Sequence, residues 1–189
     1  MIINIGRELA AGGRAVGKAL SESLSLAYYD KELIFEAAKE SNFDANLFAQ
    51  ADEICNPYMY AMSGNKTELF RIQSQVIRRL AEEGNCLFVG RCADYILRDR
   101  TDCLNIFLSC DKEERIHRLE KRLSISAKQA EELIEKTDRQ RAAYYNFYTN
   151  GVWGAAANYD ICINTTSIDI PTTTNLIRNL CELLYSRRA

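Results

Sequence analysis

Short, uninterrupted runs of apolar residues alternate along this chain with longer segments in which apolar residues recur every three to four positions. Strands that are apolar along their whole length are typical of parallel sheets, because helices cover both faces of such sheets. We expect five such strands, at residues 2–5, 26–29, 86–89, 103–108 and 159–163. This alternation predicts a three-layer α/β/α fold with a five-stranded parallel sheet, in one domain that spans residues 1–189.

The segments between these runs carry the 3.6-residue period of helices. Helices are expected at about 14–25, at 67–83 with Gly84 as the stop, at 126–148, and from Pro171 to about 185. Candidate helix N-caps are Asp30, Asp44 and Asp111, the last with Glu114 in the spacing of a capping box, and residues 55–66 are expected to be irregular. Ligands of parallel sheets bind at the carboxyl ends of the strands, so the residues just after each strand are the first candidates for a site.

Composition argues against several classes of protein. The net charge is −2, from 24 basic and 26 acidic side chains, which gives no support for a surface that binds nucleic acid or acidic membranes. No apolar run approaches the roughly 18 residues of a membrane span, and the first residues lack the basic region of a signal peptide. The 7 cysteines are an odd number without a CxxC pair, so we expect free thiols, no zinc site and a cytoplasmic location.

The loop after the first strand has the small residues of a phosphate-binding turn. It runs from Gly6 to Arg14, and its peptide N–H groups and the following helix dipole would favour an anion. The Walker pattern GxxxxGK[ST] fits poorly, because Gly6 to Gly12 is one residue too long, Gly13 stands at the lysine position, and Ala15 offers no hydroxyl for magnesium. Two interpretations stay open. The loop is either a small-residue turn for close packing or a phosphate loop in which Arg14 replaces the lysine.

Arg141 stands in the middle of the apolar stripe of the helix expected at 126–148, whereas Arg139 points the other way. An unpaired buried arginine costs several kcal/mol or more, so Arg141 has to meet a carboxylate, an aromatic face or a bound phosphate. A pair with Asp138 one turn earlier is one explanation. A phosphate clamp is the other, and we favour it.

Three further arginines, Arg115, Arg118 and Arg122, share one arc of the helix after the fourth strand. A solvated edge laced with acidic residues explains them. His117, the only histidine, lies among charges on the same helix and is expected at the surface. A hydrolase triad is therefore disfavoured.

A set of motifs occurs in order along nearly the whole chain: Arg7, Gly12-Gly13-Arg14, Tyr29-Asp30-Lys31-Glu32-Leu33, Val89-Gly90-Arg91, Glu113-Glu114-Arg115, Asp138-Arg139-Gln140-Arg141, Trp153-Gly154 and Asn158-Tyr159-Asp160. Together these motifs resemble the cytidylate kinase-like family. Proteins of this family are similar in layout to bacterial cytidylate kinase and carry a GGR-type loop in place of GK[ST].

The resemblance implies the P-loop NTPase fold of nucleoside-monophosphate kinases, with ATP at the first loop and Mg²⁺ bound through its phosphates. The residues that it implies for the triphosphate are Gly6, Arg7, Ala11, Gly12, Gly13, Arg14 and Ala15, with Arg118 and Arg122 from the lid and with Asn164 and Thr165 at the adenine. The residues that it implies for the acceptor are Asp30, Arg91, Asp94 and Arg141. Arg14, Arg141 and Asp30 are expected to carry the transfer, although Asp30 is equally explained as a helix N-cap.

From this resemblance we expect a phosphotransferase that moves the γ-phosphate of ATP to a nucleoside monophosphate, CMP or dCMP. A helical insertion at about 30–84 would bind the acceptor, and a lid would lie at about 115–155. The expected partners are small nucleotides, with neither nucleic acid nor membrane, and the expected state is a monomer or a homodimer. Two alternatives stay open: a nucleotide-binding regulatory protein with weak or no turnover, and a kinase of another small molecule.

Overall fold

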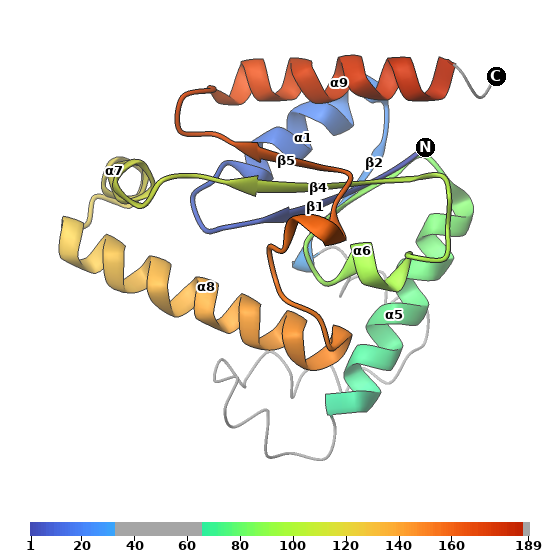
Figure 1. Cartoon of the computed structure of the whole chain (residues 1–189), viewed down its shortest axis with the longest axis horizontal. Coiled ribbons are helices and arrows are strands. Elements are labelled where there is room, and N and C mark those ends of the chain that lie inside the picture. Colours follow the sequence, from blue (N-terminus) through green and yellow to red (C-terminus); the bar gives the residue numbers. More distant parts are fainter. Residues whose placement is uncertain (33–65, 187–189) are drawn as a thin grey trace.

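The computed structural model of the chain describes residues 1–32 and 66–186 (Figure 1). Five strands form one all-parallel sheet in the order β2-β3-β1-β4-β5. Their bounds are β1 (Ile2–Arg7), β2 (Ala27–Tyr29), β3 (Cys86–Val89), β4 (Cys103–Ser109) and β5 (Ile161–Asn164). The predicted fold, an α/β protein with a five-stranded parallel sheet, is confirmed.

Helices cover both faces of this sheet (Figure 1). Their bounds are α1 (Gly13–Leu24), α5 (Lys66–Glu83), α6 (Ala93–Ile96), α7 (Lys112–Leu123), α8 (Ala127–Thr149) and α9 (Ile170–Ser186), with a short 3-10 helix at Ala156–Asn158. One face of the sheet packs against α1 and α9, and the opposite face packs against α5 and α6. A smaller apolar cluster joins α7 to α8 beside the first loop.

The strands alternate their side chains between two cores, which explains why their sequences are apolar throughout. Ile3 and Ile5 of β1 belong to the core under α1 and α9, whereas Ile2 belongs to the core under α5 and α6. The polar exception is Asn4, which is buried and donates from its Nδ2 to Asn105 Oδ1 at 2.8 Å. This bond satisfies the amide nitrogen, whereas the Asn4 Oδ1 atom is buried without a hydrogen-bond partner among the described residues.

Most of the predicted elements are confirmed, with shifted ends. The main shift is at β1, which continues through Gly6 to Arg7 because these residues pair with Phe107 and Leu108 of β4. The loop that follows therefore begins at Glu8, two residues later than the sequence indicated. The last strand starts at Ile161 and not at Tyr159, because the preceding residues form the 3-10 turn. The four-residue helix α6 was not predicted.

The capping box predicted for Asp111 and Glu114 is wrong. The Asp111 side chain accepts no N-cap bond, and its Oδ1 instead accepts a hydrogen bond from Asn164 at 3.1 Å. A capping box is present at α8, where Ser126 and Gln129 bond each other's backbone. The helix predicted after Asp30, the cap at Asp44 and most of the irregular stretch at 55–66 lie outside the described residues.

The six described cysteines are free, as predicted, and four of them are buried. Burial raises the pKa of the Cys86 and Cys92 thiols to about 12, so both stay protonated at neutral pH. Within residues 1–32 and 66–186, no helix combines the length and the apolar character that a membrane crossing requires.

Candidate phosphate-binding site

The loop Glu8–Gly12 joins β1 to α1 and ends in a backbone conformation that favours glycine. Gly12 has φ +89°, and a Cβ atom there would collide with the Ile170 side chain of α9. The first N–H bonded within the α1 pattern is that of Val16, which donates to Gly12 O at 2.9 Å. The N–H groups of the preceding helical residues therefore have no acceptor within the helix, which is the ordinary state of a helix N-terminus. Such an end attracts anions.

Two side chains from outside the loop, Arg118 and Thr165, donate hydrogen bonds to its carbonyl oxygens. Arg118 Nη1 donates to Ala10 O at 3.2 Å, and Thr165 Oγ1 donates to Ala11 O at 3.1 Å. Arg118 is also bound to Thr165, through Nη2 to the carbonyl oxygen at 2.6 Å. Because a trans peptide points its C=O and N–H in opposite directions, the carbonyl held by Thr165 turns the Gly12 N–H away from that side chain. Thr165 is fully buried, so this contact is part of the fold.

Arg7, the last residue of β1, extends its side chain across two glycines. Its Cγ lies 2.7 Å from the place that a Cβ atom would take at Gly13, and its guanidinium lies against Gly90. Gly90 follows β3 directly and has φ +75°. The Arg7 side chain therefore passes over the start of α1 and reaches the carboxyl end of the neighbouring strand, a path that a Cβ atom at either glycine would obstruct.

Arg7, Arg91 and Arg141 gather at this edge of the sheet, and we call them the strand-side cluster. Arg141 Nη1 donates to Arg7 O at 3.1 Å. Burial, and then the charge of Arg141, lower the pKa of Arg7 to about 10, and the charge of Arg91 acts in the same direction. Burial also lowers the pKa of Arg141, although Asp138 opposes this from 3.6 Å. Cations gathered in this way stabilise an anion placed among them.

Arg91 is held in place by neighbouring side chains of α5 and α8. Its Nε donates to Gln73 Oε1 at 2.8 Å, and its guanidinium lies over the Tyr144 ring, 4.9 Å from the centroid. Tyr144 donates in turn to the same Gln73 oxygen at 3.1 Å. The backbone of Arg91 has φ +63°, an unusual conformation for a residue with a side chain. This set of contacts fixes the guanidinium next to the loop.

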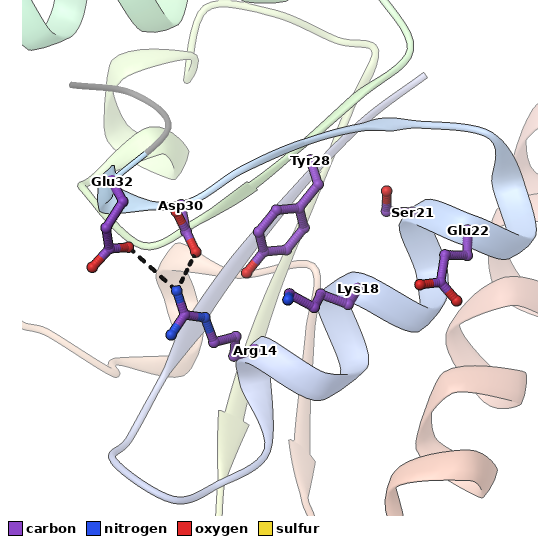
Figure 2. Close-up of a pocket in the computed structure, with 7 residues that line it drawn as sticks. All are labelled: Arg14, Lys18, Ser21, Glu22, Tyr28, Asp30 and Glu32. Carbon is purple, nitrogen blue, oxygen red and sulfur yellow. Dashed lines mark hydrogen bonds and ion pairs between the residues drawn. The ribbon is translucent and has the colours of Figure 1, made fainter. Parts of the chain in front are cut away.

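Arg14 points to a different place, the end of β2 (Figure 2). Its Nη2 lies 2.8 Å from Asp30 Oδ2 and 3.5 Å from Glu32 Oε2, and its side chain is 66% exposed. The hydrogen bond that Arg14 donates to the Asp30 carboxylate raises the pKa of Arg14. Figure 2 shows this pair at one end of an open groove along α1, with Tyr28 and Lys18 beside it. The structure thus brings Arg14 and Asp30 together as an ion pair.

A second ion-pair network supports the loop from α7 and α8. Asp138 Oδ1 accepts from Leu9 N at 2.8 Å, and Asp138 Oδ2 accepts from Arg115 Nη1. Glu8 Oε2 accepts from Cys110 N at 2.9 Å and lies 3.8 Å from Arg115 Nε. Arg115 is 8% exposed, so it is not part of a solvated edge. The sequence did not predict that Arg115 supports the loop. The D-x-x-R spacing from Asp138 to Arg141 was a signal only that Asp138 and Arg141 face inward.

The remaining predicted site residues lie around this centre. Ala11 is buried and its N–H donates to Glu8 O at 3.4 Å, whereas a Cβ atom at Gly6 would meet Phe107. Ala15 and Arg122 are exposed. Asn164 is also exposed and bonds Asp111.

Asp94 on α6 accepts a hydrogen bond from Tyr145 OH at 2.8 Å, and burial raises its pKa. His117 and Arg139 are exposed, as predicted.

A sequence profile of the cytidylate kinase-like family matches residues 2–167 of this chain. The chain belongs to the cytidylate kinase-like family. This membership confirms the predicted resemblance. It also supports a kinase-type phosphotransferase.

Several solved structures share the fold of this cytidylate kinase-like protein. An uncharacterized protein from Eubacterium ventriosum is 31% identical, with a TM-score of 0.79 over 96% of this chain and 98% of that chain. A shikimate kinase from Bacteroides thetaiotaomicron is 15% identical, with a TM-score of 0.59 over 96% and 98% of the two chains. The Bacillus subtilis YorR protein, crystallised with phosphorylated GDP, is 15% identical, with a TM-score of 0.54 over 98% of both. The last two likenesses concern the fold alone. No curated protein matches the sequence.

Proposed function

We propose that this protein transfers the γ-phosphate of ATP to a nucleoside monophosphate, with CMP and dCMP as the first acceptors to test. The observation that carries the proposal is the guanidinium of Arg7. It is half-buried beside two other arginines at the carboxyl edge of the sheet, and no carboxylate of the described residues lies within 4.0 Å of it. A charge in that setting needs an anion, and family membership makes a nucleotide phosphate the natural one.

The donor phosphates would bind at the loop Glu8–Gly12. The peptide N–H groups of Gly12, Gly13, Arg14 and Ala15 would face the β- and γ-phosphates, while Thr165 and Arg118 keep the loop carbonyls turned away. This positioning role is our assignment for Thr165, whose hydroxyl is already bonded to two carbonyls. Exposed Asn164 and Arg122 lie nearer the rim and remain proposed contacts of the donor nucleotide.

Arg141 and Arg91 would hold the acceptor phosphate across the strand-side cluster. An oxygen of the acceptor phosphate attacks the γ-phosphorus while the bond from that phosphorus to the β–γ bridging oxygen breaks, so that ADP leaves with the bonding electrons. Charge develops on the transferring oxygens, and guanidinium groups already fixed around them stabilise it without reorganising. Asp30, at the carboxyl end of β2, would orient the acceptor once Arg14 releases it. Asp94 would influence the acceptor site only indirectly, through the hydrogen bond that it accepts from Tyr145.

Magnesium would be held mainly by the phosphate oxygens. Among the described residues no group of three or more His, Cys, Asp or Glu side chains could hold a metal ion, and Ala15 offers no hydroxyl. Asp30 is the carboxylate that we assign to it, through water. When bound, the ion would neutralise charge on the β- and γ-phosphates.

A second candidate function is favoured by one observation. Gly13 replaces the lysine of the Walker pattern, and Arg14, the cation next to it, is engaged by two carboxylates. A regulatory protein that binds nucleotide without turning it over would tolerate such a loop. A kinase of another small molecule would differ from our proposal only in its acceptor.

A coupled assay with a panel of nucleoside monophosphates, each with ATP and with GTP, tests the proposal. Turnover with one monophosphate is the expected result. Calorimetric binding of ATP without turnover of any acceptor would support the regulatory protein instead. Turnover confined to acceptors that are not nucleotides would leave the kinase chemistry standing and remove the nucleoside-monophosphate assignment.

A further inference from the structure

We infer that Arg7 supplies the cation that the lysine of the Walker pattern supplies elsewhere, and that it reaches the donor phosphates from the strand side of the loop. The inference rests on the proposed function, because it assumes that a triphosphate binds at Glu8–Gly12. It differs from the expectation raised by the sequence, in which Arg14 replaces the lysine.

The spacing of the loop supports this assignment once the end of β1 is known. Four residues separate Arg7 from Gly12, which is the spacing between the two glycines of GxxxxGK[ST]. Arg7 pairs with Leu108 as the last residue of β1, so the count starts there and not at Gly6. Gly13 then stands at the lysine position. Relative to the pattern, an arginine has replaced the first glycine and a glycine has replaced the lysine.

These two replacements are sterically complementary. The Arg7 Cγ and Cβ atoms lie 2.7 and 2.9 Å from the place that a Cβ atom would take at Gly13. A lysine at position 13 would therefore need the volume that the Arg7 stem fills. Gly90 likewise leaves room for the Arg7 guanidinium, because a Cβ atom at Gly90 would collide with it. One cationic side chain is thus accommodated over the start of α1, and it comes from the strand.

The surroundings of the two candidate cations separate them. Arg14 is 66% exposed and already forms a 2.8 Å ion pair with Asp30. Arg7 has no carboxylate of the described residues within 4.0 Å. Its backbone carbonyl oxygen accepts a hydrogen bond from Arg141 of α8. The pKa of Arg7, about 10, is still well above neutral, so its charge is retained for an anion. A guanidinium fork can bond two phosphate oxygens at once, which suits a group at the β–γ junction.

The test is calorimetric titration of ATP and of inorganic tripolyphosphate into wild-type, Arg7→Met, Arg14→Met and Arg139→Met proteins. Methionine keeps most of the stem that packs over Gly13 and removes the charge. Loss of a charge-assisted contact should weaken both ligands by about tenfold or more for Arg7→Met. Arg139→Met removes an exposed guanidinium of α8 and should change neither affinity. Tripolyphosphate has no base or sugar, so a matched loss for both ligands assigns the contact to phosphate.

Unchanged affinity of Arg7→Met, with wild-type binding intact, would overturn the inference and leave the proposed function standing. A loss confined to Arg14→Met would return the role to Arg14. Failure of the wild-type protein to bind either ligand would instead overturn the proposed function itself.

A swap of the two positions keeps the inference testable if Arg7→Met fails to fold. Arg7→Gly combined with Gly13→Lys rebuilds the Walker arrangement, and it should bind tripolyphosphate at least about tenfold more tightly than Arg7→Gly alone. Gly13→Lys alone should lower the melting temperature, because the lysine meets the Arg7 stem. Equal affinity of the folded swap and the folded single variant would show that a cation at this place does not matter.

Discussion

The arginines around the first loop fall into two regions that differ in what surrounds their charges. In the strand-side cluster, burial and the charges of two other arginines lower the pKa of Arg7. Burial lowers the pKa of Arg141, whose contact with Asp138 is long, at 3.6 Å. Elsewhere around the loop, Arg14 and Arg115 each lie against a carboxylate, Asp30 and Asp138 respectively. A fold gains nothing from an arginine that repels its neighbours in a buried place, whereas a paired arginine stabilises it.

The comparison teaches where to look for function in this family member. We expect the paired arginines to hold the loop in shape and the strand-side cluster to bind a ligand. Replacing a paired, buried arginine should therefore cost stability, and replacing a clustered one should cost activity. The predictions that follow test this division, beginning with the largest expected effect.

Arg115→Met should cause the largest loss of stability, about 3 kcal/mol in the free energy of unfolding. The substitution leaves Asp138, whose side chain is 16% exposed, without its closest cation. Urea denaturation with linear extrapolation measures the loss, and Arg122→Met, an exposed change on the same helix, is the control and should stay within about 0.5 kcal/mol. Equal stability of the two variants would mean that Arg115 does not support the loop.

Arg141→Met should lower kcat/KM by about 10²-fold or more, because a fixed cation near the transferring oxygens is lost. Its folding should be nearly unaffected, since the contact with Asp138 is long, at 3.6 Å. Steady-state kinetics measures the loss, and a thermal melt measures folding. Arg139→Met, two residues away on the exposed side of α8, is the matched control. Unfolding of Arg141→Met, or an equal kinetic loss in the control, would place Arg141 with the paired arginines.

The inward direction of Arg141 was predictable because helical periodicity is a local property. Its neighbours Ile134 and Tyr145 are buried, and the 3.6-residue period places Arg141 between them on the same side. The sheet was predictable for a related reason, since strands that are buried on both faces have to be apolar throughout. Both inferences need only residues that are close in sequence.

The role of Arg7 could not be predicted in this way. It depends on the exact end of β1, which the pairing with β4 extends past Gly6, and on Gly90, which lies far away in sequence. The contact between Arg118 and Thr165 is equally hidden, because these residues are 47 positions apart and no periodic pattern links them. Arg14 was the cation that the sequence offered in place of the lysine. Its ion pair with Asp30 became evident only from the structure.

Thr165→Val should have an intermediate effect on both properties. The hydroxyl lies 3.1 Å from both Ala11 O and Ser109 O. Valine would leave Ala11 O without this donor in a buried place, whereas Ser109 O would keep its bond from Thr165 N at 2.8 Å. We expect a loss of about 1–3 kcal/mol in the free energy of unfolding, with weaker ATP binding because the Gly12 N–H is less well oriented. Thr172→Val, an exposed threonine of α9, is the control. A loss of stability with unchanged ATP affinity would separate the shape of the loop from its binding.

Glu32→Gln should have the smallest effect, within about 0.5 kcal/mol of wild-type stability, because exposed ion pairs contribute little. Its Oε2 lies 3.5 Å from Arg14 Nη2, and both side chains are about two-thirds exposed. The difference from wild type should shrink further when urea denaturation is repeated at about 1 M salt, where the Debye length falls to roughly 3 Å. A small, salt-sensitive value means that the charge on Arg14 is balanced mainly by Asp30. A large change in the free energy of unfolding that salt does not reduce would mean that Arg14, Asp30 and Glu32 form a charge site as organised as the strand-side cluster. The two regions would then not differ in the way that we infer.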